Sequence, residues 1–185
     1  TMSPQKTILS YCELEETFPV DFAIYDLGRF LQISSLFEDP EFEFQNDRLT
    51  ISGEKHEVTY RYAEPDMIIT PPKKKLELPE EGQIVTHVTW IDFGKMMRGA
   101  SILQKPEVQI RATGDGIFLE AVDTKDMSGD NYSIELNTIG SSDTVGTFIF
   151  KIENLKLIEG DYAIKLSPKG MAEFVNQTTN INYFI

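Results

Sequence analysis

Three places in the chain carry an acidic residue followed three positions later by a basic one, each at the end of a stretch typical of a β-strand. They are Asp26–Arg29, Asp92–Lys95 and Glu153–Lys156. A carboxylate at a helix start can accept hydrogen bonds from free backbone amides and stabilise the positive end of the helix dipole. A single copy of this spacing is common by chance. Three copies, each after a strand, indicate an internal duplication with a basic residue held near the first helical turn.

Positive charge in this acidic chain is concentrated around the same junctions. The windows Asp26–Phe37, Asp92–Lys105 and Lys151–Leu157 hold six basic and three acidic residues, a net charge of +3. The rest of the chain holds 11 basic and 27 acidic residues, a net charge of −16. Two interpretations remain open. The helices present cations to a polyanion such as the DNA backbone, or they simply carry solvated lysines and arginines.

No other cluster of side chains indicates catalysis. Asp92-Phe93-Gly94 matches a protein-kinase tripeptide, but no glycine-rich phosphate loop or His-Arg-Asp triplet accompanies it. His56 and His87 have no nearby ligands for zinc, and the acidic loop 123–130 lacks the EF-hand spacing. Cys12 follows a strand-like run and fits a small buried side chain better than a nucleophile. We therefore expect no enzymatic activity and no cofactor.

The overall composition limits the class of protein. The net charge of −13 over 185 residues argues against an ordinary duplex-binding domain, because such domains are basic. No apolar run approaches the length of a membrane span, and the first nine residues lack the features of a signal peptide. The single cysteine cannot form an internal disulfide, which favours a reducing cytoplasm.

Strand signals dominate the chain, with few helices, so we predict an α+β fold that is mainly antiparallel β. Helices are expected near Leu27–Phe37 and Ile91–Leu103, with a single turn at Asn154–Leu157. The expected strands are Thr7–Glu13, Asp21–Tyr25, Glu41–Gln45, Leu49–Ser52, Glu57–Tyr62, Ile84–Thr89, Glu107–Ala112, Ile117–Val122, Tyr132–Asn137, Thr147–Lys151, Tyr162–Leu166, Met171–Asn176 and Ile181–Ile185.

A proline-bearing segment at residues 70–82 separates two stretches that each contain strands and a helix. Its prolines cannot donate to an interior sheet ladder. We expect a first domain over residues 1–69, this segment as an interdomain connector, and a second domain over residues 83–185. The alternative is a long surface loop within one domain.

The stretch Phe22–Leu31 resembles a strand-to-helix junction in the sliding clamps of T-even-type bacteriophages. The resemblance continues through the connector and the helix around Phe93–Leu103, is strong at Glu159–Leu166, and ends in the hairpin from Met171 to Ile185. No single stretch is diagnostic, but the collinear series covers nearly all of the chain. More distantly, the pattern resembles the cellular clamp, proliferating cell nuclear antigen. Family members begin with a further helix, so the first domain is expected to be N-terminally incomplete, as a fragment or in reduced form.

The resemblance implies a two-domain clamp fold in which three subunits close into a ring, with few short helices lining the hole and sheets outside. Basic helices would then face the phosphate backbone without reading bases, so the ring slides. The acidic exterior would keep DNA from binding elsewhere. The expected DNA-facing residues are Arg29, Lys95, Arg98 and Lys156, with Lys105 and Lys151 as weaker candidates.

The resemblance also implies sites for partners and for ring assembly. A hydrophobic pocket beside the connector would receive the C-terminal tail of the replicative DNA polymerase. Its residues would be Met2, Leu9, Leu76, Leu78, Met171 and Phe184, for each of which plain core packing is the alternative. Head-to-tail pairing of edge strands would involve Val58, Tyr60 and Tyr62 from the first domain and Tyr132, Ile134 and Leu136 from the second.

The resulting hypothesis is a homotrimeric processivity factor that encircles double-stranded DNA in the cytoplasm of an infected bacterial host. Its implied partners include a clamp-loader ATPase and factors for late transcription. The main alternative is an acidic, β-rich phage structural or adhesion protein with no role on DNA. A more remote one is a small carbohydrate-active β-sandwich that uses paired carboxylates, although no motif selects two of them.

Overall fold

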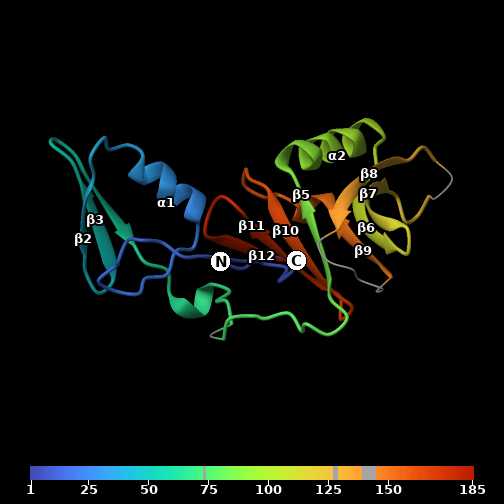
Figure 1. Ribbon diagram of the computed structural model, residues 1–185. Helices are drawn as coiled ribbons and strands as arrows, with labels where there is room; N and C mark the ends of the chain where they lie inside the picture. The colour runs from blue at the N-terminus through green and yellow to red at the C-terminus, as the bar shows by residue number, and fades with distance from the viewer. Residues whose placement is uncertain (73, 127–128, 139–144) are drawn as a thin grey trace. The chain divides into compact units, whose positions relative to one another are not determined.

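The computed structural model describes residues 1–72, 74–126, 129–138 and 145–185 (Figure 1). The chain divides into a smaller unit, residues 14–70, and a larger unit, residues 1–13 with 71–185. The sequence-based division had placed residues 1–13 with the smaller unit. The two divisions differ because β1 (Leu9–Cys12) pairs antiparallel with β12 (Ile181–Phe184) at the other end of the chain.

The larger unit is built on a nine-stranded antiparallel arrangement in the order β1-β12-β11-β10-β5-β8-β7-β6-β9. Among the described residues, two pairs, Thr86–Thr138 and His87–Asn137, join β5 to β8, so two sub-sheets meet at a narrow seam. The remaining strands are β5 (Ile84–Val88), β6 (Glu107–Thr113), β7 (Gly116–Val122), β8 (Tyr132–Thr138), β9 (Gly146–Lys151), β10 (Tyr162–Ser167) and β11 (Met171–Asn176).

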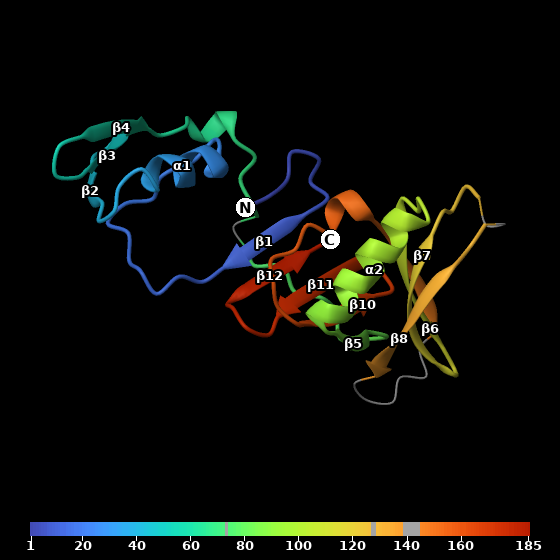
Figure 2. The same ribbon diagram turned by 90° about the horizontal axis from the view of Figure 1, so that it is seen from above.

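Helix α2 (Trp90–Ile102) packs against β7 and β8 of the larger unit (Figures 1 and 2). Its buried residues are Phe93, Met96 and Ala100, at the spacing that places side chains on one helical face. Thr89 caps its start by accepting a hydrogen bond from the backbone N–H of Asp92 at 3.1 Å. The apolar face is thereby fixed on the sheet, and the charged face is left exposed.

The smaller unit combines one helix with a three-stranded sheet. Its helix α1 (Leu27–Ser34) lays half-buried Phe30 and Ile33 on a core of Phe37, Leu49 and Ile51. The sheet order is β2-β3-β4, and η1 is a 3₁₀ turn. Their bounds are β2 (Glu41–Phe44), β3 (Arg48–Ser52), β4 (Glu57–Arg61) and η1 (Pro65–Met67).

The strand predicted at Asp21–Tyr25 does not form. This stretch is irregular, and its backbone bond to the following chain runs from the N–H of Ala63 to the carbonyl of Ala23 at 2.9 Å. The residue types are typical of a strand, but no described strand lies beside this stretch to pair with it. Pairing, rather than propensity, decides such short segments.

The same order of elements, a helix followed by an antiparallel three-strand meander, occurs three times. The copies are α1-β2-β3-β4, α2-β6-β7-β8 and η2-β10-β11-β12, where η2 is the 3₁₀ turn Ile152–Asn154. The predicted fold, mainly antiparallel β with few short helices, is confirmed. The turn expected at Asn154–Leu157 begins two residues earlier, at Ile152.

The three acidic residues at these junctions do not share one helical position. Asp26 caps α1 by accepting a hydrogen bond from the N–H of Arg29 at 2.9 Å, as the spacing predicted. Asp92 instead lies inside the first turn of α2, because Thr89 is the cap, and Glu153 lies within η2. The duplication is therefore carried by the order of elements and not by a conserved cap. No helix in the described part of the chain is long and apolar enough to span a membrane.

Candidate functional site

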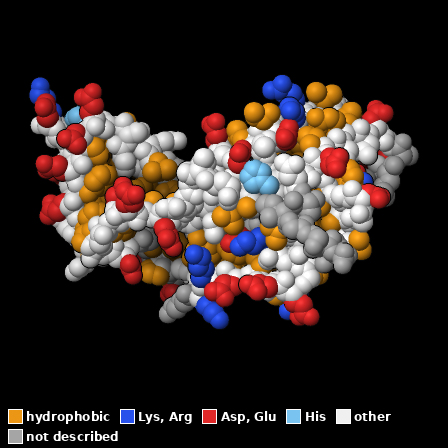
Figure 3. Space-filling model, in the orientation of Figure 1, with side chains coloured by type: hydrophobic (Ala, Val, Ile, Leu, Met, Phe, Trp, Pro, Cys, Tyr) orange, Lys and Arg blue, Asp and Glu red, His pale blue; other side chains and the backbone are white. Residues whose placement is uncertain are grey.

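Helix α2 presents two of the predicted DNA-facing residues to solvent. Lys95 and Arg98 are both exposed, and Figure 3 shows basic side chains over the position of this helix. The ammonium of Lys95 lies 2.9 Å from Oδ1 of Asp92. Hydrogen bonds from Lys95 and Thr89 lower the pKa of the Asp92 carboxyl, while the same carboxylate raises the pKa of Lys95. Arg98 makes no ion pair within the described residues, so its charge is free for a polyanion.

Arg29 occupies the first turn of α1 in the smaller unit, where it is exposed. It borders a hollow of about 820 Å³ in the smaller unit, together with Val58, Tyr60 and Tyr62. Burial raises the pKa of the Tyr60 hydroxyl, partly opposed by the nearby guanidinium of Arg29. The basic residue of this junction therefore lies beside the strand β4.

The other three basic candidates do not lie on helices. Lys105 follows the end of α2 and is half-buried, with its N–H donating to the carbonyl of Ala100 at 2.8 Å. Lys151 is the last residue of β9, and Lys156 follows η2. Lys151 and Lys156 both line the same hollow in the larger unit, which also contains predicted partner-pocket residues.

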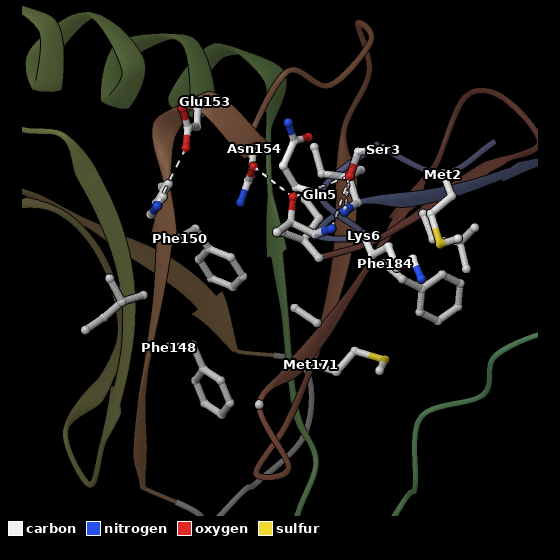
Figure 4. Close-up of a pocket in the computed structure, with 18 of the residues that line it drawn as sticks. Met2, Ser3, Gln5, Lys6, Phe148, Phe150, Glu153, Asn154, Met171 and Phe184 are labelled. Atoms are coloured by element: carbon white, nitrogen blue, oxygen red, sulfur yellow. Dashed lines mark hydrogen bonds and ion pairs between the residues drawn. The ribbon is translucent and has the colours of Figure 1, made fainter. Parts of the chain in front are cut away.

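That hollow, here called the β9 groove, has a volume of about 980 Å³ (Figure 4). Leu9, Leu78 and Phe184 form a buried cluster, against which half-buried Met2 and Leu76 pack. The structure thus brings the residues of the predicted pocket together at one place. Five of them line the groove: Met2, Leu9, Leu76, Met171 and Phe184.

A tight turn near the start of the chain builds one wall of the β9 groove. The hydroxyl of Ser3 accepts hydrogen bonds from the N–H groups of Thr7 and Ile8, each at 3.1 Å. An isolated bridge pairs Met2 with Leu9, and the hydroxyl of Thr7 donates to Oδ1 of Asn154 at 3.3 Å (Figure 4). These bonds hold Met2 at the groove and tie the turn to the segment after β9.

Sequence reasoning missed the opposite wall of the β9 groove. It is formed by residues 147–151 of β9, with Phe148 and Phe150 pointing into the hollow (Figure 4). The alternation of apolar and other residues had indicated a strand here. Alternation assigns the two faces of a strand but does not identify the strand's neighbours, so the wall was not predictable from it.

The predicted assembly residues lie on two strands that each have an open edge, except Tyr62, which follows the end of β4. Among the described residues, β4 pairs only with β3, and Tyr132–Leu136 of β8 pair only with β7. Their side chains turn inward: Val58 and Tyr60 pack on the core of the smaller unit, and Tyr132 and Ile134 on that of the larger. An interface here would use backbone hydrogen bonds more than these side chains.

A buried carboxylate joins three strands of the larger unit. Glu120 on β7 accepts hydrogen bonds from Arg111 Nε at 2.9 Å and Nη2 at 2.6 Å, and from Gln109 Nε2 at 2.6 Å. The Ser133 hydroxyl on β8 lies 3.4 Å away. The Arg111 hydrogen bonds lower the pKa of the Glu120 carboxyl, against the opposing effect of burial. Within the described chain no group of three His, Cys, Asp or Glu side chains could hold a metal ion.

Curated sequences similar to this chain are phage sliding clamps. The sliding clamp of Vibrio phage KVP40 is 28% identical over 182 residues, which cover 96% of this chain and 80% of that protein. The sliding clamp of Enterobacteria phage T4 is 25% identical over 175 residues, 92% of this chain and 75% of that protein. No protein-family model matches.

Solved structures with this fold are DNA clamps. The PCNA of Thermococcus kodakaraensis superimposes with a TM-score of 0.68 at 13% identity, covering all of this chain and 83% of that one. The Helicobacter pylori beta clamp, bound to a DNA ligase peptide, gives a TM-score of 0.69 at 17% identity, covering 97% of this chain. This chain spans about half the length of that beta clamp.

At these low identities the structural likeness establishes the fold alone, while the phage proteins add collinear sequence similarity. The predicted resemblance is thereby confirmed: this chain is a relative of the sliding clamps of T4-type bacteriophages and has the DNA clamp fold.

Proposed function

We infer that this chain is a DNA polymerase sliding clamp, a ring-forming processivity factor that encircles duplex DNA and tethers the replicative polymerase. The observation that carries this inference is the collinear similarity to the KVP40 clamp over 96% of the chain, on a clamp fold of repeated helix-and-meander units. Its contribution to replication is topological and not catalytic. It acts in the cytoplasm of an infected bacterial host.

The DNA-facing surface rests mainly on the exposed basic residues Arg29, Lys95 and Arg98. Each lies on a helix, and α1 and α2 together hold these three cations against one carboxylate, Asp92, in a chain of −13. Such side chains neutralise phosphates without contacting base edges, which gives attraction with no sequence preference. Lys105 extends this surface after the end of α2, whereas Lys156 lines the β9 groove and is a weaker member. Lys151, which ends a strand, is the weakest member.

The proposed ring closes by pairing β4 of one subunit with β8 of the next. The pairing of β12 with β1 supports this arrangement, because β12 and β4 occupy the same place as last strand of their repeats. The last strand of one repeat already accepts an edge strand within this chain. A homotrimer would repeat that junction between copies, and the open edges of β4 and β8 are free to form it.

The β9 groove is the proposed site for partners, with the polymerase tail as the main occupant. Its apolar residues Met2, Leu76 and Phe184 can anchor large side chains of a peptide. A clamp-loader ATPase and late-transcription factors would compete for the same surface.

The full-length protein can test this proposal directly. Negative-stain imaging should show closed rings. A clamp loaded onto nicked circular DNA by its cognate loader should stay bound at high salt and be released when the circle is cut, because the linkage is topological. The proposal would be contradicted if the clamp left the DNA at high salt and if cutting the circle made no difference to its binding. Filaments or isolated globules without any loading would favour the structural-protein alternative.

A further inference from the structure

Within the part of the chain that the structure describes, one edge of β9 has no neighbouring strand. The strand pairs with β6, and no described residue pairs with its other edge. In an antiparallel ladder, residues alternate between those bonded to the partner strand and those whose backbone groups point the other way. The N–H of Ile152 donates to the carbonyl of Pro106 at 3.1 Å in the same register. The alternation therefore assigns to the open edge the N–H and C=O groups of Thr147, Ile149 and Lys151.

This edge borders the β9 groove. Residues 147–151 line the groove, and Phe148 lies across the hollow from Met171 (Figure 4). Ile149, on the outer face of the strand, is 49% exposed. Natural proteins usually cover an apolar edge strand or place charges along it, because it can pair with another chain. Here the strand Gly146–Lys151 has one charged residue, at its end.

The equivalent strand of the preceding repeat is protected. β5 precedes α2 as β9 precedes η2, and both precede a three-strand meander. The second edge of β5 is closed by the end of β8, through Thr86–Thr138 and His87–Asn137. No described strand does the same for β9. The open edge is therefore a departure from the repeat, located beside the partner pocket.

The charges around the β9 groove have the opposite sign to the chain as a whole. Its lining includes Lys6, Lys151 and Lys156 against the single acidic residue Glu153, in a chain of net charge −13. Lys151 lies 3.7 Å from Glu153, and both side chains are mostly exposed. Exposed pairs of this kind contribute little stability, so Lys151 can exchange its partner at small cost. The groove thus favours an acidic occupant.

We propose that the partner pocket continues along β9, where an extended acidic and apolar segment of a partner protein adds as a strand to the open edge. The proposal rests on the proposed function, since it takes the groove as the clamp's partner site. Main-chain bonds to Ile149 and Lys151 would supply affinity. Alternate side chains of the segment would enter the groove beside Phe148 and Phe150, and the others would lie next to Lys151. The recognised sequence therefore alternates apolar residues with carboxylates.

Amide hydrogen exchange measured by NMR tests the backbone pairing. The probe is a capped eight-residue peptide in which leucine and phenylalanine alternate with aspartate. Binding should slow exchange of the Ile149 and Lys151 amides, because they gain bonds. The amides of Phe148 and Phe150 already bond to β6 and should change much less. Equal protection of all four, or none at saturation, would overturn the proposal.

Two substitutions at one position separate the backbone from the side chain. Ile149→Pro removes an amide that points away from β6, a place where an edge strand tolerates proline. It should weaken peptide binding about fivefold or more, since it removes one main-chain bond and obstructs the edge. Ile149→Ala keeps the amide and should bind within about twofold. Fluorescence of the sole tryptophan, Trp90, checks folding of both variants.

A charge reversal tests the acidic requirement independently of Ile149. Lys151→Glu should weaken the aspartate peptide about two- to fivefold, as for an exposed ion pair. A peptide carrying lysine in place of aspartate should bind this variant better than it binds the wild type. If Lys151→Glu prefers the aspartate peptide over the lysine peptide as strongly as the wild type does, the acidic occupant is refuted.

The outcomes distinguish this proposal from the proposed function. Binding that depends on Phe184, without alternating protection along β9, would overturn strand addition and leave the partner pocket intact. Failure of the wild-type protein to bind the peptide at millimolar concentration would overturn the strand proposal, whereas ring formation and loading onto circles test the clamp assignment separately.

Discussion

Removing the guanidinium that faces Glu120 should strongly destabilise the larger unit. In Arg111→Met the aliphatic stem is kept, but the carboxylate loses two hydrogen bonds, at 2.9 and 2.6 Å. The Glu120 side chain is only 5% exposed, so it cannot recover those bonds from water. Removing one partner of a fully buried pair costs about 3–5 kcal/mol. Because the Arg111 side chain is 38% exposed and Gln109 still donates, we expect a loss of about 2 kcal/mol.

The assay is urea unfolding followed by Trp90 fluorescence, since the only tryptophan lies in the larger unit. The pH dependence gives a second measurement. The folded-state pKa of Glu120 is lowered, so its stabilisation is present above its unfolded pKa and is lost as pH falls through the folded value. The difference between wild type and Arg111→Met should therefore shrink in acid.

The matched control is Lys95→Met, which removes a cation from the exposed Asp92 pair on α2 and should leave the unfolding midpoint nearly unchanged. Equal midpoints for wild type and Arg111→Met at neutral pH would refute the argument. So would a difference between them that grows as the pH falls.

Three further perturbations address packing, DNA and assembly. Gly99→Ala places a Cβ within 3 Å of the Tyr132 ring and should lower the free energy of unfolding in urea by about 1–3 kcal/mol. The loss should be smaller when Tyr132 is also changed to alanine, and additive losses from the two substitutions would contradict the contact. Changing Lys95 and Arg98 together to glutamate should abolish processive synthesis with the cognate loader and polymerase while the melting temperature holds, and intact synthesis would remove these helices from the DNA surface. Glu135→Pro removes an N–H that points away from β7 and should convert trimers to monomers in sedimentation, whereas Ile134 bonds to β7 within the subunit; persistent trimers would place the interface elsewhere.

Local patterns predicted most of the elements of this fold. Helix α2 follows from the spacing of Phe93, Met96 and Ala100, and its observed bounds differ from the prediction by one residue at each end. Its cap was missed because Asp92 and Thr89 are both acceptable caps by residue type. Only the backbone geometry shows that the threonine accepts the bond.

Long-range pairing accounts for what the sequence did not reveal. A strand was predicted at Thr7–Glu13, where β1 forms, but nothing in its residues identifies β12 as its neighbour from the other end of the chain. The same limit hid the wall at Phe148 and Phe150, since alternation describes a strand's faces and not its edges. Leu9, Leu78 and Phe184, which the collinear resemblance had placed at one site, form a buried cluster; such a resemblance carries pairing information that propensities lack.

The seam between β5 and β8 has a mechanical consequence. Two residue pairs hold the sub-sheets there, whereas β6 and β7 share seven along their length. Among the described residues, a bending load would separate fewer ladder bonds at the seam than between β6 and β7, while one hydrophobic core still packs against both sub-sheets. The backbone ladder is therefore more compliant at this seam than between β6 and β7, and resistance to bending there depends on the shared core.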